Sequence, residues 1–170
     1  TAAAGSRDNT PVVLTGSADG TITYGNDSVT VDASHTEEGY LMVSYSGSNS
    51  KVKLQITGSD EITYTYNLHD GYETFPLTSG SYTVGVFENI EGTSYSTLFT
   101  QAIDVTIQDE FGPYLYANQY VNFSADSKVI SKAMELSASA NDDLEVIENV
   151  YNYIITNFTY DYDKAASVQS

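Results

Sequence analysis

The sequence predicts a mainly β protein with helices toward its C-terminal end, and three observations carry this prediction. From about residue 12 to residue 107, apolar residues alternate with polar ones, and turn-forming residues interrupt the alternation about every eight to twelve positions. The 170-residue chain has 15 tyrosines and no tryptophan, which is typical of half-exposed strands. The alternation stops at about residue 109, and helical spacing begins at about residue 125. The expected fold class is an immunoglobulin-like antiparallel β-sandwich followed by an irregular connector and two α-helices.

Three parts follow one another in the expected domain organisation. Residues 1–10 are small and polar, so we expect a flexible tail there. Residues 11–110 should form the immunoglobulin-like β-sandwich domain, and residues 111–170 a connector plus two helices. With 41% hydrophobic residues, a chain of this length can bury a core without disulfides or a structural metal ion.

The β-patterned region divides into short strands. We expect them at residues 12–14, 21–24, 29–31, 40–45, 52–56, 62–66, 72–75, 82–87, 94–99 and 103–107. The turn signal Asp19-Gly20 predicts a hairpin between the first two. Two alternating apolar sets should face each other across two packed sheets: Leu41, Val43 and Tyr45, and Val52, Leu54 and Ile56.

One tyrosine stands out as a structural residue. A turn at residues 77–81 leads into the pattern Gly80-x-Tyr82-x-Val84. Immunoglobulin-like sandwiches place a tyrosine corner at such a position, where the tyrosine hydroxyl bonds back to nearby backbone. Tyr82 is therefore the candidate for a structural tyrosine corner.

The C-terminal part has the pattern of a connector and two helices. Residues 109–120 are aromatic and irregular, with Gly112-Pro113 as a helix and strand breaker. A first helix is expected over about 125–139 and a second over 141–158. Asp142 and Glu145 stand at capping-box spacing at the start of the second helix. Its apolar residues share one face at helical spacing: Leu144, Ile147, Tyr151, Ile154 and Phe158.

This apolar face needs a large partner surface. The first helix and the connector can supply part of it, and further chain on the C-terminal side can supply the rest. Exposed, the same face would support a homodimer. We therefore predict an interaction surface that includes Tyr151, Ile154 and Phe158.

Residues 145–161 resemble the opening helix of transglutaminase-like domains, members of the papain-like cysteine hydrolase superfamily found in bacterial secreted and surface proteins. The resemblance rests on the helix and the following Asn157-Phe158-Thr159-Tyr160-Asp161. Three segments of the β region also resemble the β-domain that precedes this core in some such proteins: residues 39–45, 72–77 and 97–99. The resemblance implies that residues 111–170 are the start of a transglutaminase-like core, truncated before its catalytic part.

The resemblance assigns no catalytic residue to this chain. In that family a cysteine attacks an acyl carbon, and a histidine and an aspartate further along complete a triad. The chain has no cysteine, so no side chain can supply the thiolate nucleophile. We expect a non-catalytic chain, whatever the activity of a parent protein.

Net charge and hydropathy limit the classes of partner that the chain can bind. The formal net charge is −17, from 23 acidic and 6 basic residues. Nucleic acid is excluded as a partner because phosphate binding needs clustered lysine and arginine. No apolar run approaches the ~18 residues that span a bilayer, so no membrane insertion is expected. The low-lysine, tyrosine- and threonine-rich β sequence favours an extracellular or cell-surface location.

Other candidate sites are weaker. The pair Asp161 and Asp163 is too small for a calcium site, and His35 and His69 lack metal-ligand spacing. No cofactor or metal is expected. Several strand tyrosines could form a platform for sugar rings or simply pack against the core: Tyr24, Tyr40, Tyr45, Tyr64, Tyr66, Tyr72 and Tyr82.

We keep two main functional hypotheses. The first is an accessory N-terminal module of a secreted or cell-surface transglutaminase-like protein, which positions the catalytic core or contacts a protein or cell-wall partner. The second is a free-standing extracellular β-sandwich module that binds carbohydrate or protein. A cation-stabilised adhesion repeat is a third, weaker hypothesis.

Overall fold

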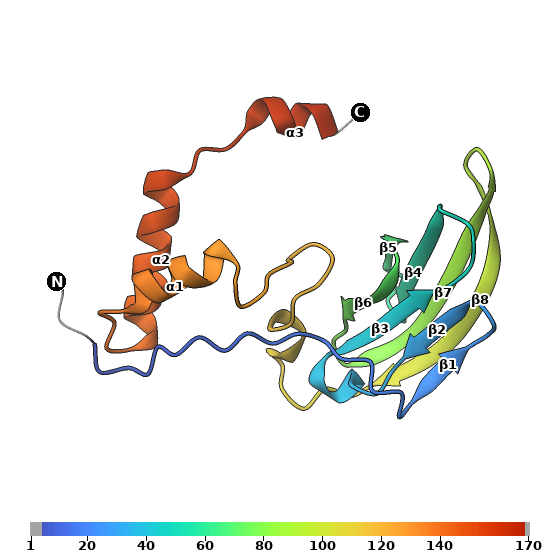
Figure 1. Ribbon diagram of the computed structural model, residues 1–170, viewed down its shortest axis with the longest axis horizontal. Coiled ribbons are helices and arrows are strands. Elements are labelled where there is room, and N and C mark those ends of the chain that lie inside the picture. Colours follow the sequence, from blue (N-terminus) through green and yellow to red (C-terminus); the bar gives the residue numbers. More distant parts are fainter. Residues whose placement is uncertain (1–4, 169–170) are drawn as a thin grey trace. The chain divides into compact units, whose positions relative to one another are not determined.

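The computed structural model describes residues 5–168 (Figure 1). It is mainly β, with two antiparallel four-stranded sheets and, within the described residues, three α-helices. The chain divides into two compact units. The sheet unit comprises Val13–Asn122, and the helical unit comprises the residues before Val13 and those from Phe123 onward.

The first sheet has the strand order β1-β2-β3-β6 (Figure 1). Its strands are β1 (Thr23–Gly25), β2 (Val29–Asp32), β3 (Tyr40–Tyr45) and β6 (Gly71–Pro76). The second sheet has the order β5-β4-β7-β8. Its strands are β4 (Val52–Gly58), β5 (Thr63–Leu68), β7 (Gly80–Glu91) and β8 (Ser94–Val105). Every pairing in both sheets is antiparallel.

Both sheets contribute to one hydrophobic core. The alternation noted in the sequence puts Leu41 and Val43 from β3 into the same buried cluster as Leu54 and Ile56 from β4. The largest side chains with almost no exposure come from both sheets: Val29, Val31, Leu41, Val43, Leu54, Ile56, Phe75, Val84 and Val86. Burial of these side chains supplies the main driving force for folding of the sheet unit.

The expected N-terminal hairpin is wrong. Residues 12–14 form no strand, and Leu14 makes only an isolated parallel bridge with Tyr116. Gly20 does adopt a positive φ of 71°, as an Asp-Gly turn requires. Its N–H, however, donates a 2.7 Å hydrogen bond to the carboxylate of buried Asp32, and not to the backbone of a partner strand. The turn chemistry was present, but its partner is a side chain.

The C-terminal end of the β region also differs from expectation. The two strands expected at 94–99 and 103–107 are one long strand, β8, paired with β7 along its length. A register shift between Val86 and Phe87 interrupts this pairing. Such an irregularity changes which residues face the core and so disturbs the alternation on which the sequence-based boundary depended.

The connector belongs to the sheet unit, so the expected boundary at residue 110 lies instead at Asn122. Its short 3-10 helix η2 (Gly112–Tyr114) packs beside η1 (Thr36–Glu38). Gly39, which follows η1, has φ 93°, and a Cβ placed there would lie 2.6 Å from the Pro113 ring. A side chain at Gly39 would therefore strain the backbone and displace the connector.

The helical unit contains α1 (Lys128–Ser137), α2 (Asp143–Asn157) and α3 (Tyr162–Val168). The first two are shorter than expected by a few residues at their ends. The third was not expected, although Asp161 caps it by accepting a 2.9 Å hydrogen bond from the N–H of Lys164. Residues 169–170 of the expected core start lie outside the described residues.

Part of the expected flexible tail is bound to the helices. The N–H of Gly5 donates to the carbonyl of Ala138 at 3.1 Å, and the side chain of Asn9 donates to the carbonyl of Ser137 at 2.7 Å. Arg7 pairs with Asp143 at the start of α2. Residues 5–9 therefore complete the α1–α2 corner, where Ala140 is fully buried. Residues 1–4 of the expected tail lie outside the described residues.

Candidate functional site

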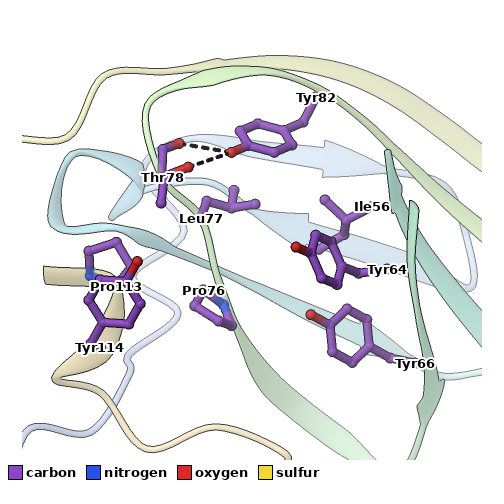
Figure 2. A pocket seen from close by; sticks show the side chains of 9 residues that line it. All are labelled: Ile56, Tyr64, Tyr66, Pro76, Leu77, Thr78, Tyr82, Pro113 and Tyr114. Atoms are coloured by element: carbon purple, nitrogen blue, oxygen red, sulfur yellow. Dashed lines mark hydrogen bonds between the residues drawn. The ribbon is translucent and has the colours of Figure 1, made fainter. Parts of the chain in front are cut away.

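A tyrosine-lined pocket in the sheet unit is the candidate site (Figure 2). Its cavity volume is about 250 Å³, slightly below the ~300 Å³ at which pockets for drug-sized ligands begin. Its walls come from both sheets and from the connector, and most of the lining is aromatic, aliphatic or proline side chain. The residues are Ile56, Tyr64, Tyr66, Pro76, Leu77, Thr78, Tyr82, Pro113 and Tyr114.

Strand β5 supplies one wall. Tyr64 and Tyr66 are two positions apart and therefore project from the same face of the strand. They pair with Ile56 and Leu54 of β4, whose side chains are in the core. Tyr66 is buried and its ring meets Phe75 edge-on at 4.9 Å, whereas Tyr64 is 58% exposed. This wall therefore has a fixed inner ring and an accessible outer ring.

Tyr82 supports the wall formed by the loop between β6 and β7. Its hydroxyl donates to the carbonyl oxygen of Thr78 at 3.2 Å and lies 3.0 Å from the Thr78 hydroxyl (Figure 2). Tyr82 stands near the start of β7, and the bond runs back to backbone four residues upstream. This is the contact for which Tyr82 was singled out in the sequence, and it holds Leu77 and Thr78 at the pocket.

The connector supplies the opposite wall. Figure 2 shows Pro113 and Tyr114 across the pocket from Tyr64 and Tyr66, with Pro76 between the two sides. Pro113 is buried against Gly39, whereas Tyr114 is 75% exposed. The pocket thus has two accessible tyrosine rings at its rim, each carried on a backbone segment fixed by buried contacts.

A polar pocket adjoins the tyrosine-lined one and shares Tyr64, Thr78 and Tyr82 with it. Its volume is about 210 Å³, and its further lining is mostly backbone, hydroxyl and carboxylate: Gly58, Ser59, Asp60, Ile62, Ser79, Gly80 and Ser81. A third pocket includes Tyr82 and Asp104, but Asp104 lies on the outer face of β8, between the buried Ile103 and Val105. We call the joined surface of the first two pockets, from Tyr114 to Asp60, the Tyr82 groove.

A charged cluster lies at His35. Its Nε2 is 2.9 Å from Asp19 and its Nδ1 is 3.2 Å from Glu38, and Glu38 also accepts a 2.7 Å hydrogen bond from the hydroxyl of Tyr116. Burial alone would lower the pKa of His35, but its hydrogen bonds to Glu38 and Asp19 outweigh burial and raise it. The hydrogen bond from Tyr116 lowers the pKa of Glu38.

The same cluster includes a serine, but it is not arranged for nucleophilic catalysis. Ser17 Oγ lies 3.2 Å from His35 Nε2. A general base must be neutral at this nitrogen to accept a proton. The two carboxylates instead favour the protonated imidazolium, and Asp19 occupies Nε2 at a shorter distance. The cluster therefore acts as a structural clamp between η1, the N-terminal loop and the connector.

A second polar contact attaches the connector to β6. Glu73 accepts hydrogen bonds from the N–H of His69 at 2.7 Å and from the Gln119 side chain at 2.9 Å. Burial would raise the pKa of Glu73, but these bonds lower it overall. His35 and His69 thus each pair with carboxylates. Among residues 5–168, no group of three or more His, Cys, Asp or Glu side chains is placed to hold a metal ion.

The expected tyrosine platform does not exist as one surface. Tyr40 and Tyr66 are buried, and Tyr24, Tyr45 and Tyr82 pack partly buried against the core. Tyr72 is 46% exposed but does not line the Tyr82 groove. Of the seven tyrosines considered, the structure brings Tyr64, Tyr66 and Tyr82 together and adds Tyr114, which the sequence pattern did not single out.

The apolar face predicted on α2 is exposed in the described structure. Its side chains Leu144, Ile147, Tyr151, Ile154 and Phe158 are between 49% and 68% exposed. We call these five residues the α2 stripe. The helix packs on α1 through a different face: the side chain of Asn149 donates to the Leu136 carbonyl at 3.0 Å, and Lys132 lies over the Tyr153 ring.

No helix of the described chain combines the length and apolar character needed to cross a membrane.

No protein family matches the chain, and neither a curated protein nor a solved structure is detectably similar to it. The resemblance to transglutaminase-like proteins therefore rests on the quoted sequence segments alone.

Sequence reasoning missed two parts of the candidate site. The sequence pattern places Pro113 and Tyr114 in a connector outside the β domain, and it gives no signal for Asp60. The one available signal is the aromatic, apolar content of residues 109–120, which is typical of a segment packed against a surface. Nothing in that content specified which surface, because the contacting segments are far apart in the chain.

Proposed function

We propose that this chain is the non-catalytic accessory module of a secreted or cell-surface transglutaminase-like protein. In this proposal the sheet unit is a rigid scaffold, and the helical unit packs against the catalytic core as its first helices. The single observation that carries the proposal is the exposure of the α2 stripe, in a segment whose sequence resembles the opening helix of that core.

The stripe has the character of an interface. Single exposed apolar side chains are common on protein surfaces, but a contiguous apolar patch indicates a site of association. Four large side chains at helical spacing on α2, with Phe158 directly after its last residue, make such a patch. The opposite, α1-facing side already has its partners, so the stripe is available for a separate surface.

The sheet unit fits an immunoglobulin-like sandwich, which is the finer part of the proposal. The order β5-β4-β7-β8 corresponds to the C′-C-F-G sheet of variable-type domains, and β3 and β6 then take the positions of strands B and E. The Tyr82–Thr78 bond at the start of β7 corresponds to a tyrosine corner on strand F. Such domains commonly serve as rigid scaffolds for binding loops.

The coding sequence on the C-terminal side of Ser170 tests the proposal. We expect a cysteine within a few tens of residues, followed by a histidine and an aspartate in a triad order. A stop codon directly after Ser170 would contradict the accessory role. The purified chain itself should show no acyl-transfer or protease activity, and turnover that survives cysteine-directed inhibitors would contradict the resemblance.

The stripe can also be tested on the isolated chain by analytical ultracentrifugation. We expect a monomer whose stability changes by less than about 0.5 kcal/mol in the double variant Ile147→Ser/Ile154→Ser, because both side chains are exposed. A dimer that dissociates in this variant would assign the stripe to a second copy of the chain. That outcome would contradict packing on a catalytic core.

A free-standing extracellular module that binds carbohydrate or protein is the second candidate. The Tyr82 groove favours it, because accessible aromatic rings beside hydroxyl and carboxylate groups are typical of ligand sites. Titration of the chain with candidate ligands, followed by nuclear magnetic resonance, tests this function. Unchanged signals from the groove residues with every saccharide and peptide probe would contradict it.

A further inference from the structure

We propose that the Tyr82 groove binds an uncharged oligosaccharide built of hexose units. This inference rests on the second proposed function, a binding module, and specifies its ligand. It requires one sugar ring to enter the tyrosine-lined pocket while neighbouring hydroxyl groups reach the polar pocket around Tyr82.

The apolar half of the groove suits the C–H face of a sugar ring. Tyr64 and Tyr114 present accessible rings on opposite sides, and Pro76 lies between them (Figure 2). Tyrosine offers a flat apolar surface with a hydroxyl at its edge, so it can contact a sugar face and remain hydrated. The pocket volume of about 250 Å³ is large enough for one sugar ring.

The polar half supplies acceptors for sugar hydroxyl groups. The carboxylate of Asp60 accepts a 3.1 Å hydrogen bond from the N–H of Ile62. A carboxylate can accept about four hydrogen bonds, so Asp60 retains acceptor capacity toward a ligand. Its carboxylate is exposed, and Ser59 and Ser79 line the same pocket.

This arrangement discriminates between ligand classes. A net charge of −17, with Asp60 at the groove itself, disfavours anionic polysaccharides by like-charge repulsion. Proline-rich peptides also dock in aromatic grooves, but their prolines have no N–H to donate to carboxylates. Sugar hydroxyl groups donate freely. The groove chemistry therefore favours an uncharged saccharide over both alternatives.

Internal contacts fix the backbone on both sides of the groove. The hydrogen bonds between Thr78 and Tyr82 hold the β6–β7 loop in place. The contact of Pro113 with Gly39 fixes the backbone that carries Tyr114. Preformed sites lose less conformational entropy on binding, which favours weak ligands such as short saccharides. The ring of Tyr66 closes the inner end of the wall against Phe75.

The test is a titration of the full chain, labelled with nitrogen-15, followed by nuclear magnetic resonance. The probes are the hexasaccharides of β-1,4-glucose, β-1,4-mannose and β-1,4-N-acetylglucosamine, together with a decaproline peptide, each to millimolar concentration. We expect at least one hexasaccharide to shift the amide signals of residues lining the groove. The variants Tyr64→Ala and Tyr114→Ala should each weaken that binding about tenfold or more, which corresponds to the loss of one ring contact.

Tyr72→Ala is the matched control. It removes a tyrosine of β6 that is 46% exposed and lies outside the groove, and it should leave the affinity unchanged. The amide spectra of all three variants establish that each is folded.

Three outcomes would overturn the proposal. Decaproline binding without saccharide binding would retain a binding module but assign it a peptide. Saccharide binding that depends on Tyr72 and not on Tyr64 or Tyr114 would place the site elsewhere. Failure of every probe to shift the groove signals would contradict both this inference and the binding module.

Discussion

The hydroxyl group of Tyr82 is the only part of that side chain that reaches the Thr78 carbonyl, so Tyr82→Phe isolates its contribution. We expect the free energy of unfolding of the sheet unit to fall by about 1–2 kcal/mol, because the variant loses the bonds of this hydroxyl to both the carbonyl and the hydroxyl of Thr78. Denaturant unfolding measures it. Tyr64→Phe is the control, since Tyr64 is exposed, and an equal loss in both variants would contradict a special role for Tyr82.

His35 makes the stability of the sheet unit depend on pH. Its pKa in the folded protein is raised above the ordinary 6.5, so its contribution is complete below pH 6.5 and is lost as pH rises through the folded value. Glu38 has a lowered pKa, so its contribution is present above pH 4.5 and lost below it. The clamp is therefore strongest between these two values.

The variant His35→Gln tests this window. The difference in unfolding free energy between the natural chain and the variant should be larger near pH 5.5 than near pH 8.5. Denaturant titrations at the two pH values measure this difference. A constant difference across the range would show that His35 contributes only by packing against Tyr40.

Tyr116 makes the stability of the sheet unit depend on pH in the alkaline range. Burial, together with its hydrogen bond to Glu38, raises the pKa of Tyr116 to about 12 from the ordinary 10. The protonated phenol is thus favoured by folding, and its contribution is lost as pH rises from 10 toward 12. Tyr116→Phe should be less stable than the natural chain at neutral pH and should lose less stability over that range.

At the residue scale, the sequence predicts contacts whose partners lie nearby in the chain. Tyr82 could be identified because its partner Thr78 is only four residues upstream in the chain. Tyr116 and Gln119 could not be paired with Glu38 and Glu73, because these contacts join segments that only the folded β unit brings together. Local turn chemistry is readable from sequence, but long-range side-chain partners are not.

Among the elements, α2 allows the clearest test of a local signal. Asp142 caps it by accepting a 2.9 Å bond from the N–H of Glu145. Asp142→Ala should destabilise the helix by about 1 kcal/mol. Amide hydrogen exchange in the first turn of α2 measures this loss. Glu148→Ala, in the exposed middle of the helix, is the control and should leave protection unchanged.

The cap and the packing of α2 were predictable to different degrees. The expected capping box forms only in part, since Glu145 reaches back to the N–H of Asn141 and not to that of Asp142. The apolar pattern identified the helix but not its packed face. Val146, Val150 and Tyr153 are the less exposed side chains, whereas the more regular stripe is exposed. Periodicity defines an apolar face, and tertiary contact determines which face is used.

For the whole molecule, the two compact units predict separate responses to mutation. Leu54 is fully buried in the sheet unit, so Leu54→Ala should destabilise that unit by about 2–5 kcal/mol. Amide exchange in α2 should remain unchanged. Parallel loss of protection in α2 would show that the two units unfold as one. Comparison of exchange across both units in the same sample distinguishes these results.

The class of the molecule was more predictable than its boundaries. Alternation was enough to place most strands of both sheets, because one face of each strand must be buried. The boundary between units was misplaced because Gly112-Pro113 reads as a breaker, whereas η2 packs on the sheet unit through Gly39. A breaker ends an element, but it does not end the unit to which the element belongs.

The attachment of the connector has a practical consequence for anyone who expresses the sheet unit alone. A gene fragment cut at residue 110 would delete Pro113, Tyr116 and Gln119, and with them the partners of Gly39, Glu38 and Glu73. It would also delete one wall of the Tyr82 groove. A fragment from residue 13 to residue 122 keeps all of these contacts, so it is the smallest piece on which crystallisation or ligand screening should be attempted.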